Sequence, residues 1–224
     1  VTFSDSFIKS LSEGNVTLVF DFYEGADCEF LLTVTDTSAL EDIDTFENYT
    51  DDSQLRSAYT PNTNGNNITV SLVDSTNGKA MRFEYDVSLP NGYSGVNHAL
   101  SQRNVAQYKG VSITLAGDNS GNTFTLQFKD KNDNYFEKEF AVDFYGEKTI
   151  KIPFEEFNAP SWQSSSATLD TTGIVQVAFY AGRGGNADTG AYMIDDVYFY
   201  NEEQETEGAR LIDKTGTFDG SAPA

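Results

Sequence analysis

Four aromatic side chains of this sequence stand at loop or strand-end positions, where folding can leave their rings uncovered: Tyr59, Tyr93, Trp162 and Tyr180. A flat ring packs against the axial C–H groups of a sugar, and tyrosine adds a polar tip for water or a hydroxyl group. Each such contact contributes on the order of 1 kcal/mol. We expect these rings to gather on one sugar-binding surface, although any single ring could instead cap the core.

Polar residues on two strand-like segments supply hydrogen-bonding groups for the same surface. In Thr123–Lys129 and Tyr135–Val142 the phenylalanines alternate toward one face and leave polar residues on the other. We predict that sugar hydroxyls are bound by Gln127, Tyr135, Glu137 and Arg183. The alternative is an ordinary solvated sheet face.

Two carboxylates on one of these strands raise the question of catalysis. Glu137 and Glu139 would project from one face about 6.5–7 Å apart. Inverting glycosidases separate their carboxyls by about 6.5–9.5 Å and retaining ones by about 5–5.5 Å. The spacing thus permits a small jelly-roll glycosidase. This is a minor alternative, because such enzymes use a larger cleft than one sandwich offers.

Charge and rare residues exclude several classes of function. The chain has 224 residues, with 35 acidic against 14 basic side chains and a net charge of -21. This balance argues against nucleic acid and against anionic membranes as partners, and favours a secreted protein. Cys28 is the single cysteine and reads as a strand residue, while the single histidine, His98, excludes a two-histidine metal site.

Period-two alternation recurs along the chain and predicts an all-β protein, an antiparallel β-sandwich of the jelly-roll type with a short N-terminal hairpin fragment. Short helical turns are expected near Asp51–Arg56 and Glu155–Asn158. The predicted strands are Asn15–Tyr23, Glu29–Thr35, Ile68–Val73, Ala80–Val87, Val96–Leu100, Gly110–Ala116, Thr123–Lys129, Tyr135–Val142, Lys148–Pro153, Ile174–Tyr180 and Ala191–Tyr200.

We divide the chain into a hairpin fragment (1–38), a sandwich (39–201) and an acidic linker or tail (202–224).

Carboxylates from both ends of the sandwich could share a calcium ion, and the turn Asp74–Lys79 could add carbonyl oxygens. These carboxylates are Asp44, Glu47, Asp195 and Asp196.

Six short stretches in the expected order resemble the family 11 carbohydrate-binding modules and their relatives on β-glucanases and mannanases. They are Asp44–Glu47, Thr76–Met81, Gly92–Val96, Lys148–Phe154, Ala178–Ala181 and Ile194–Val197. The resemblance implies a non-catalytic jelly roll with a concave ligand groove and a structural calcium ion. In place of the Arg/Asp-rich loop of some members, this sequence has Asn158–Ser161.

Carried over to this sequence, the resemblance implies sugar stacking by Tyr59, Tyr93 and Tyr180, with Trp162 at an aromatic position of the relatives. It implies calcium ligation by Glu47 and Asp195, with carbonyls from Asn77 and Lys79. Residues 1–38 resemble the C-terminal half of an immunoglobulin-like linker module of cellulosomal proteins, with matches at Thr2–Leu11, Thr17–Phe22 and Leu32–Thr37.

We therefore expect a module that binds single chains of a β-linked glucan or mannan. It would target an attached glycoside hydrolase of the same polypeptide to the plant cell wall, outside the cell, as a secreted protein or as part of a cellulosome. A structural spacer or adhesion module without sugar binding is the alternative from another class.

Overall fold

The computed structural model describes residues 14–20, 28–34, 41–76, 78–163 and 167–201. The chain divides into two compact units, residues 40–202 and the remaining two ends. In the second of these units, β1 (Gly14–Phe20) pairs antiparallel with β2 (Cys28–Val34), so the predicted hairpin is confirmed in its described part and Cys28 is a strand residue. The predicted acidic tail and Asn77 lie outside the described residues.

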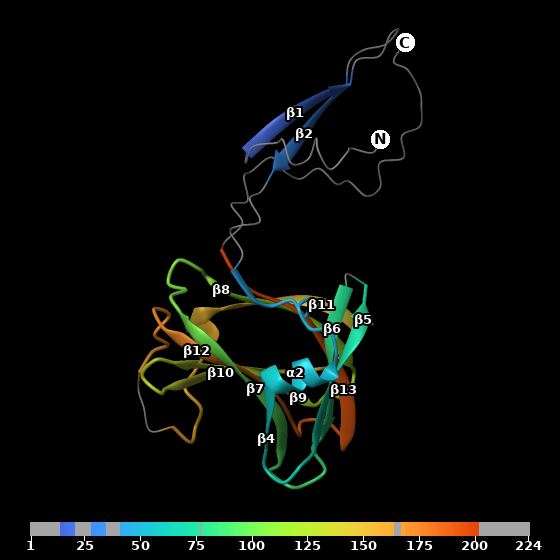
Figure 1. Ribbon diagram of the computed structural model, residues 1–224, viewed down its shortest axis with the longest axis vertical. Coiled ribbons are helices and arrows are strands. Elements are labelled where there is room, and N and C mark those ends of the chain that lie inside the picture. Colours follow the sequence, from blue (N-terminus) through green and yellow to red (C-terminus); the bar gives the residue numbers. More distant parts are fainter. Residues whose placement is uncertain (1–13, 21–27, 35–40, 77, 164–166, 202–224) are drawn as a thin grey trace. The chain divides into compact units, whose positions relative to one another are not determined.

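Residues 40–202 form a sandwich of two antiparallel sheets, which confirms the predicted fold class (Figure 1). The five-stranded sheet has the order β10–β9–β12–β7–β4. Its strands are Tyr135–Ala141, Thr123–Asp130, Ile174–Gly182, Tyr93–Arg103 and Tyr59–Thr63.

The six-stranded sheet has the order β11–β8–β13–β6–β5, and β3 pairs with β13. These strands are Tyr145–Pro153, Gly110–Asp118, Thr189–Tyr200, Gly78–Asp86, Ile68–Ser75 and, for β3, Glu41–Asp44. Among the described residues no helix is long and apolar enough to cross a membrane.

The predicted turn segments bend where the sequence places Asn, Asp and Gly. Asn91, Asn119 and Asp133 adopt positive φ angles of 57°, 55° and 62°. These residue types tolerate the left-handed region better than others, which explains why the chain reverses at these points.

Aromatic side chains fill the space between the two sheets. Phe124 of β9 meets Tyr192 of β13 at a ring-centroid distance of 5.7 Å, and Phe128 meets Phe199 at 5.8 Å. All four side chains are fully buried. Phe124 and Phe128 thus point inward, as the alternation in Thr123–Lys129 predicts, and their contacts with β13 hold the two sheets together.

Two short helical segments lie where the sequence predicts helical turns. Helix α2 (Asp52–Ala58) is capped by Asp51, whose carboxylate accepts from the backbone N–H groups of Ser53 and Gln54. A single 3₁₀ turn, η2, spans Phe154–Glu156. Helix α2 also bonds to the edge strand β5: Arg56 donates to the Val70 carbonyl at 2.8 Å, and Asp52 accepts from the Leu72 N–H at 2.8 Å.

The prediction that Tyr59 stacks on a sugar is wrong. Sequence analysis placed it in a loop, but β4 pairs with β7 and directs Tyr59 inward opposite His98, with no exposed surface. Its ring stacks on His98 at 4.7 Å, and its hydroxyl donates to Asp44 Oδ2 at 2.9 Å. Burial next to the Asp44 charge raises the pKa of Tyr59 well above its usual value.

Tyr59→Phe should lower the free energy of unfolding by about 1–2 kcal/mol, because a buried hydrogen bond to a carboxylate is lost. Urea denaturation measures this change. The control is Tyr145→Phe, whose side chain is 77% exposed and should change stability by less than about 0.5 kcal/mol. Equal stability of the two variants would show that the contact with Asp44 adds nothing to the fold.

Candidate functional site

The outer face of the five-stranded sheet collects most of the predicted site residues, because strand pairing brings their positions into register. One row of paired positions crosses β10, β9, β12, β7 and β4 at Glu137, Gln127, Ala178, Asn97 and Thr60. The next row holds Glu139, Thr125, Tyr180, Gly95 and Asn62. Gly95 has no side chain, and the Tyr180 ring of the neighbouring strand occupies the space above it.

Tyr180 and Tyr93 form the first aromatic cluster on this face. Their ring centroids lie 5.6 Å apart, with the ring planes at 86°. Tyr93 is 38% exposed and Tyr180 is partly exposed. Burial raises the pKa of Tyr180 to about 12, and the charges of Tyr93, Tyr135 and Glu137 add to the increase. Tyr93, Tyr135 and Glu137 each therefore act electrostatically on the Tyr180 hydroxyl.

Tyr135 and Trp162 form the second aromatic cluster, at the β10 edge. Their rings meet edge to face at 5.3 Å, and the Lys129 ammonium lies 5.3 Å from the Tyr135 ring centroid. Trp162 is 64% exposed, which leaves ring surface for a ligand.

The Trp162 loop is fastened along β10. Gln163 accepts from the Tyr135 N–H at 2.7 Å and donates to its carbonyl at 3.2 Å, as a neighbouring strand would. Asn158 and Glu137 exchange backbone hydrogen bonds of 2.8 and 3.0 Å. The loop thus extends the sheet and holds Trp162 at its border.

Between the clusters lies a pair of hydrogen-bonded polar side chains. Gln127 is only 6% exposed and donates through Nε2 to Glu137 Oε2 at 2.8 Å. Burial raises the pKa of Glu137, and the nearby Glu139 charge raises it further, while the Gln127 hydrogen bond lowers it. Glu137 remains an acceptor, and this bond uses one of the two N–H donors of the Gln127 amide.

Arg183 directly follows the last residue of β12 and forms an ion pair with Asp188 within the loop between β12 and β13. The loop is held by Asn122, whose Oδ1 accepts from the N–H groups of Gly184 and Gly185 at 3.2 and 3.0 Å. The structure places Arg183 in this loop at the end of β12, with its guanidinium paired to Asp188 and its side chain exposed.

Two residues of the face, Asn62 and Asn97, are not among the predicted ones, and both bond to the Tyr180 hydroxyl. The alternation in Val96–Leu100 contains the signal for Asn97, since its neighbours Val96 and His98 take the inner face. Asn62 had no such signal, because β4 is short and contains Pro61.

The predicted calcium ligands are partly brought together. Glu47 Oε1 accepts from the Lys79 N–H at 2.6 Å. An ideal Cβ on Gly78 would lie only 2.1 Å from the same oxygen, so the Glu47 carboxylate contacts the backbone of Gly78 and Lys79. Asp195 is 6% exposed, and burial raises its pKa, with the Asp196 and Glu47 charges adding to the increase.

Carboxylates such as those of Glu47 and Asp195 are hard-oxygen donors of the kind that Ca²⁺ prefers, whereas Asn77 lies outside the described residues. Among the described residues no three His, Cys, Asp or Glu side chains cluster as a metal site. Asp44 is already used, because it accepts from Tyr49, Tyr59 and the Phe46 N–H.

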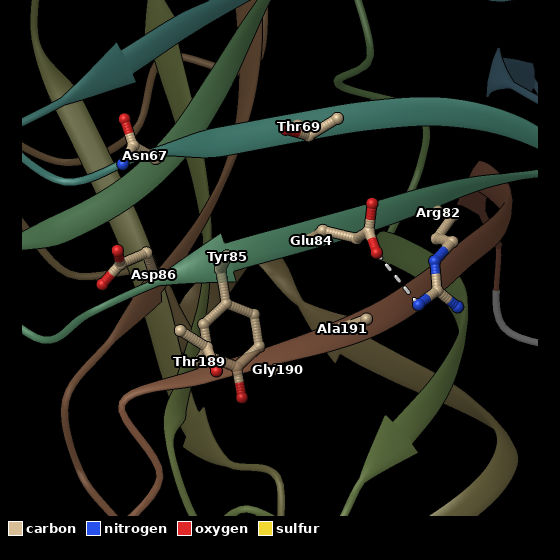
Figure 2. A pocket seen from close by; sticks show the side chains of 9 residues that line it. All are labelled: Asn67, Thr69, Arg82, Glu84, Tyr85, Asp86, Thr189, Gly190 and Ala191. Carbon is tan, nitrogen blue, oxygen red and sulfur yellow. Dashed lines mark hydrogen bonds and ion pairs between the residues drawn. The ribbon is translucent and has the colours of Figure 1, made fainter.

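A separate hollow of about 400 Å³ lies over β5, β6 and β13 of the other sheet (Figure 2). Its lining includes the ion pair of Arg82 and Glu84, at 3.1 Å, and the exposed side chain of Asn67. None of the predicted sugar-binding residues lines it.

A family model described as carbohydrate binding domain (family 11) matches residues 33–202. The chain belongs to this family of carbohydrate-binding modules. The family is non-catalytic, so this module binds carbohydrate and is not an enzyme. The alternative of a glycosidase that uses Glu137 and Glu139 is therefore wrong.

Solved family 11 modules share the fold. One from Clostridium thermocellum, in complex with a β-1,3-1,4-mixed-linked tetrasaccharide, is 20% identical, with a TM-score of 0.59 over 72% of this chain and 95% of that chain. The family 11 module of a cellulosomal cellulase of Clostridium thermocellum is also 20% identical, with a TM-score of 0.57 over 72% and 94%. No curated protein matches the sequence.

Glu137→Gln should stabilise the module at neutral pH. The pKa of the Glu137 carboxyl is higher in the folded state than in the unfolded state. The ionised carboxylate therefore lowers the free energy of unfolding above the folded-state pKa, and this loss vanishes below the unfolded-state pKa. The gain over wild type should therefore shrink as the pH falls through the carboxyl range. Urea denaturation at neutral and acidic pH measures this, with the exposed Glu147→Gln as control. A gain in stability that stays constant with pH would contradict the raised pKa of Glu137.

Proposed function

We propose that the module binds a single chain of a β-linked glucan or mannan across the outer face of the five-stranded sheet. Tyr93, Tyr180 and Trp162 would stack on pyranose rings. Tyr135, Gln127, Glu137 and Arg183 would bind hydroxyl groups. The observation that carries the proposal is that one face holds two aromatic clusters with hydrogen-bonding side chains between them.

The dimensions of the face suit a chain of several sugar units. The backbones of Tyr180 and Tyr135 are two strands and about four residues apart, which corresponds to about 17 Å in a regular sheet. Carboxylates at Glu137 and Glu139 favour a neutral polymer over an anionic one. The mixed-linked tetrasaccharide bound by a structural relative makes mixed-linkage β-glucan the first ligand to test.

The biological role we propose is to hold an attached glycoside hydrolase at plant cell-wall polysaccharide outside the cell. Tethering raises the effective concentration of the enzyme at its substrate without any new contact in the active site. The structural relative from a cellulosomal cellulase supports a place in such a polypeptide. The assignment of residues 1–38 to an immunoglobulin-like linker module stays a prediction.

We also propose a structural calcium ion at Glu47 and Asp195, with backbone carbonyls of residues 77 and 79. Burial is the main cause of the raised Asp195 pKa, and the charges of Asp196 and Glu47 add to it; a cation between Glu47 and Asp195 would offset that charge repulsion. It would also join the segment after β3 to β13, which lie at opposite ends of the sandwich sequence.

Tyr180→Ala and Trp162→Ala should each weaken binding of mixed-linkage β-glucan about tenfold, because each removes a stacking contact of about 1–1.5 kcal/mol. Affinity electrophoresis on gels containing the glucan, xyloglucan or galactomannan measures retardation. The matched control is Tyr145→Ala, an exposed ring on the other sheet, which should migrate like the wild type. Unretarded migration of the wild type on all three gels would instead indicate a spacer or adhesion module.

Calcium at 100 times its dissociation constant should raise the free energy of unfolding by about 2.7 kcal/mol relative to chelator-treated protein. Thermal denaturation with and without Ca²⁺ measures the effect. Asp195→Asn should abolish the response, whereas Glu84→Gln, an exposed carboxylate elsewhere, should retain it. A wild-type melting temperature that is equal in both conditions would rule out the site.

A further inference from the structure

The ring of Tyr180 lies across the neighbouring strand β7. Tyr180 pairs with Gly95, and an ideal Cβ on Gly95 would lie 2.0 Å from Cδ1 and 2.5 Å from Cε1 of the tyrosine ring. Real Cβ atoms essentially never approach another atom so closely. The ring therefore covers the glycine backbone, and only a residue without a side chain can stand beneath it.

Two asparagines hold the far end of this side chain. The Tyr180 hydroxyl donates to Asn97 Oδ1 at 2.8 Å on β7, and it accepts from Asn62 Nδ2 at 2.9 Å on β4. The two amides also approach each other, with Asn62 Nδ2 3.4 Å from Asn97 Oδ1. Because the hydroxyl both donates and accepts within the protein, its position is defined on both sides.

This arrangement determines what Tyr180 can offer a ligand. Its hydroxyl hydrogen is already donated to Asn97, so the hydroxyl has no donor left for a ligand, and the partly exposed ring provides the contact surface. The Tyr93 ring, at 86° to it, stands as a second surface beside the first. A ring in this position can support the C–H side of a pyranose.

We propose that Asn62, Asn97 and Gly95 are positioning residues that hold the Tyr180 ring across β7 as a preformed platform for one sugar unit. The inference rests on the proposed function, because it concerns how one ring of that face is presented. Without the two asparagines the tyrosine would be free to change rotamer and would have to be ordered at each binding event. Ordering one such side chain weakens binding about two- to tenfold.

The test compares the double variant Asn62→Ala/Asn97→Ala with Asn67→Ala, an exposed asparagine that lines the hollow of the other sheet (Figure 2). Calorimetric titration with the mixed-linked tetrasaccharide should show two- to tenfold weaker binding for the double variant, with the loss mainly in the entropy. The control should bind as the wild type does.

Nuclear Overhauser contacts between the Gly95 α-protons and the Tyr180 ring report the platform directly, without any ligand. They should be present in the wild type and in Asn67→Ala, and weakened in the double variant. Gly95→Ala provides an independent variant that keeps both asparagines: it should displace the ring and weaken binding, with thermal denaturation to verify folding.

Different results separate this inference from the proposed function. If Tyr180→Ala binds the tetrasaccharide as tightly as the wild type, the stacking role of this ring in the proposed function fails. If Tyr180→Ala weakens binding but the double variant keeps full affinity and the Gly95–Tyr180 contacts, the positioning role is overturned. Absence of those contacts in the folded wild type would overturn it as well, whatever the variants bind.

Discussion

The register of β12 between β7 and β9 is the constraint on which both the core and the binding face depend. Phe179 of β12 pairs with Val96 and Leu126, and all three are buried. The neighbouring position, Tyr180, therefore belongs to the outer face. A shift of one residue would expose Phe179 and turn Tyr180 into the core. The hydrophobic packing that stabilises the sandwich thus also determines which side chains lie on the outer face of the five-stranded sheet.

Alternation of residue types made the central strands predictable, whereas pairing partners were not. Phe124 and Phe128 face inward as their spacing indicates, and Gln127 and Glu137 share the opposite face. The hydrogen bond between Gln127 and Glu137 depends on the register of two strands, which sequence spacing alone does not determine.

Short strands account for the main error. β4 has five residues and contains Pro61, so nothing in its sequence distinguishes it from a loop. The pairing of β4 with β7 buries Tyr59, which the sequence predicts to face a ligand. The same pairing places Asn62 on the outer face, a position that the sequence does not predict. Trp162, in contrast, is exposed on a loop as expected, but its attachment along β10 through Gln163 is a tertiary feature.

Helix α2 has a consequence for how the sandwich meets other chains. Strand β5 is an edge strand, and an edge with open backbone groups can recruit a strand from a second molecule. Here the Val70 carbonyl and the Leu72 N–H are bonded to side chains of the helix. A foreign strand would have to displace Arg56 and Asp52 before it could pair. The seven-residue helix α2 therefore opposes the pairing of β5 with a strand of another molecule.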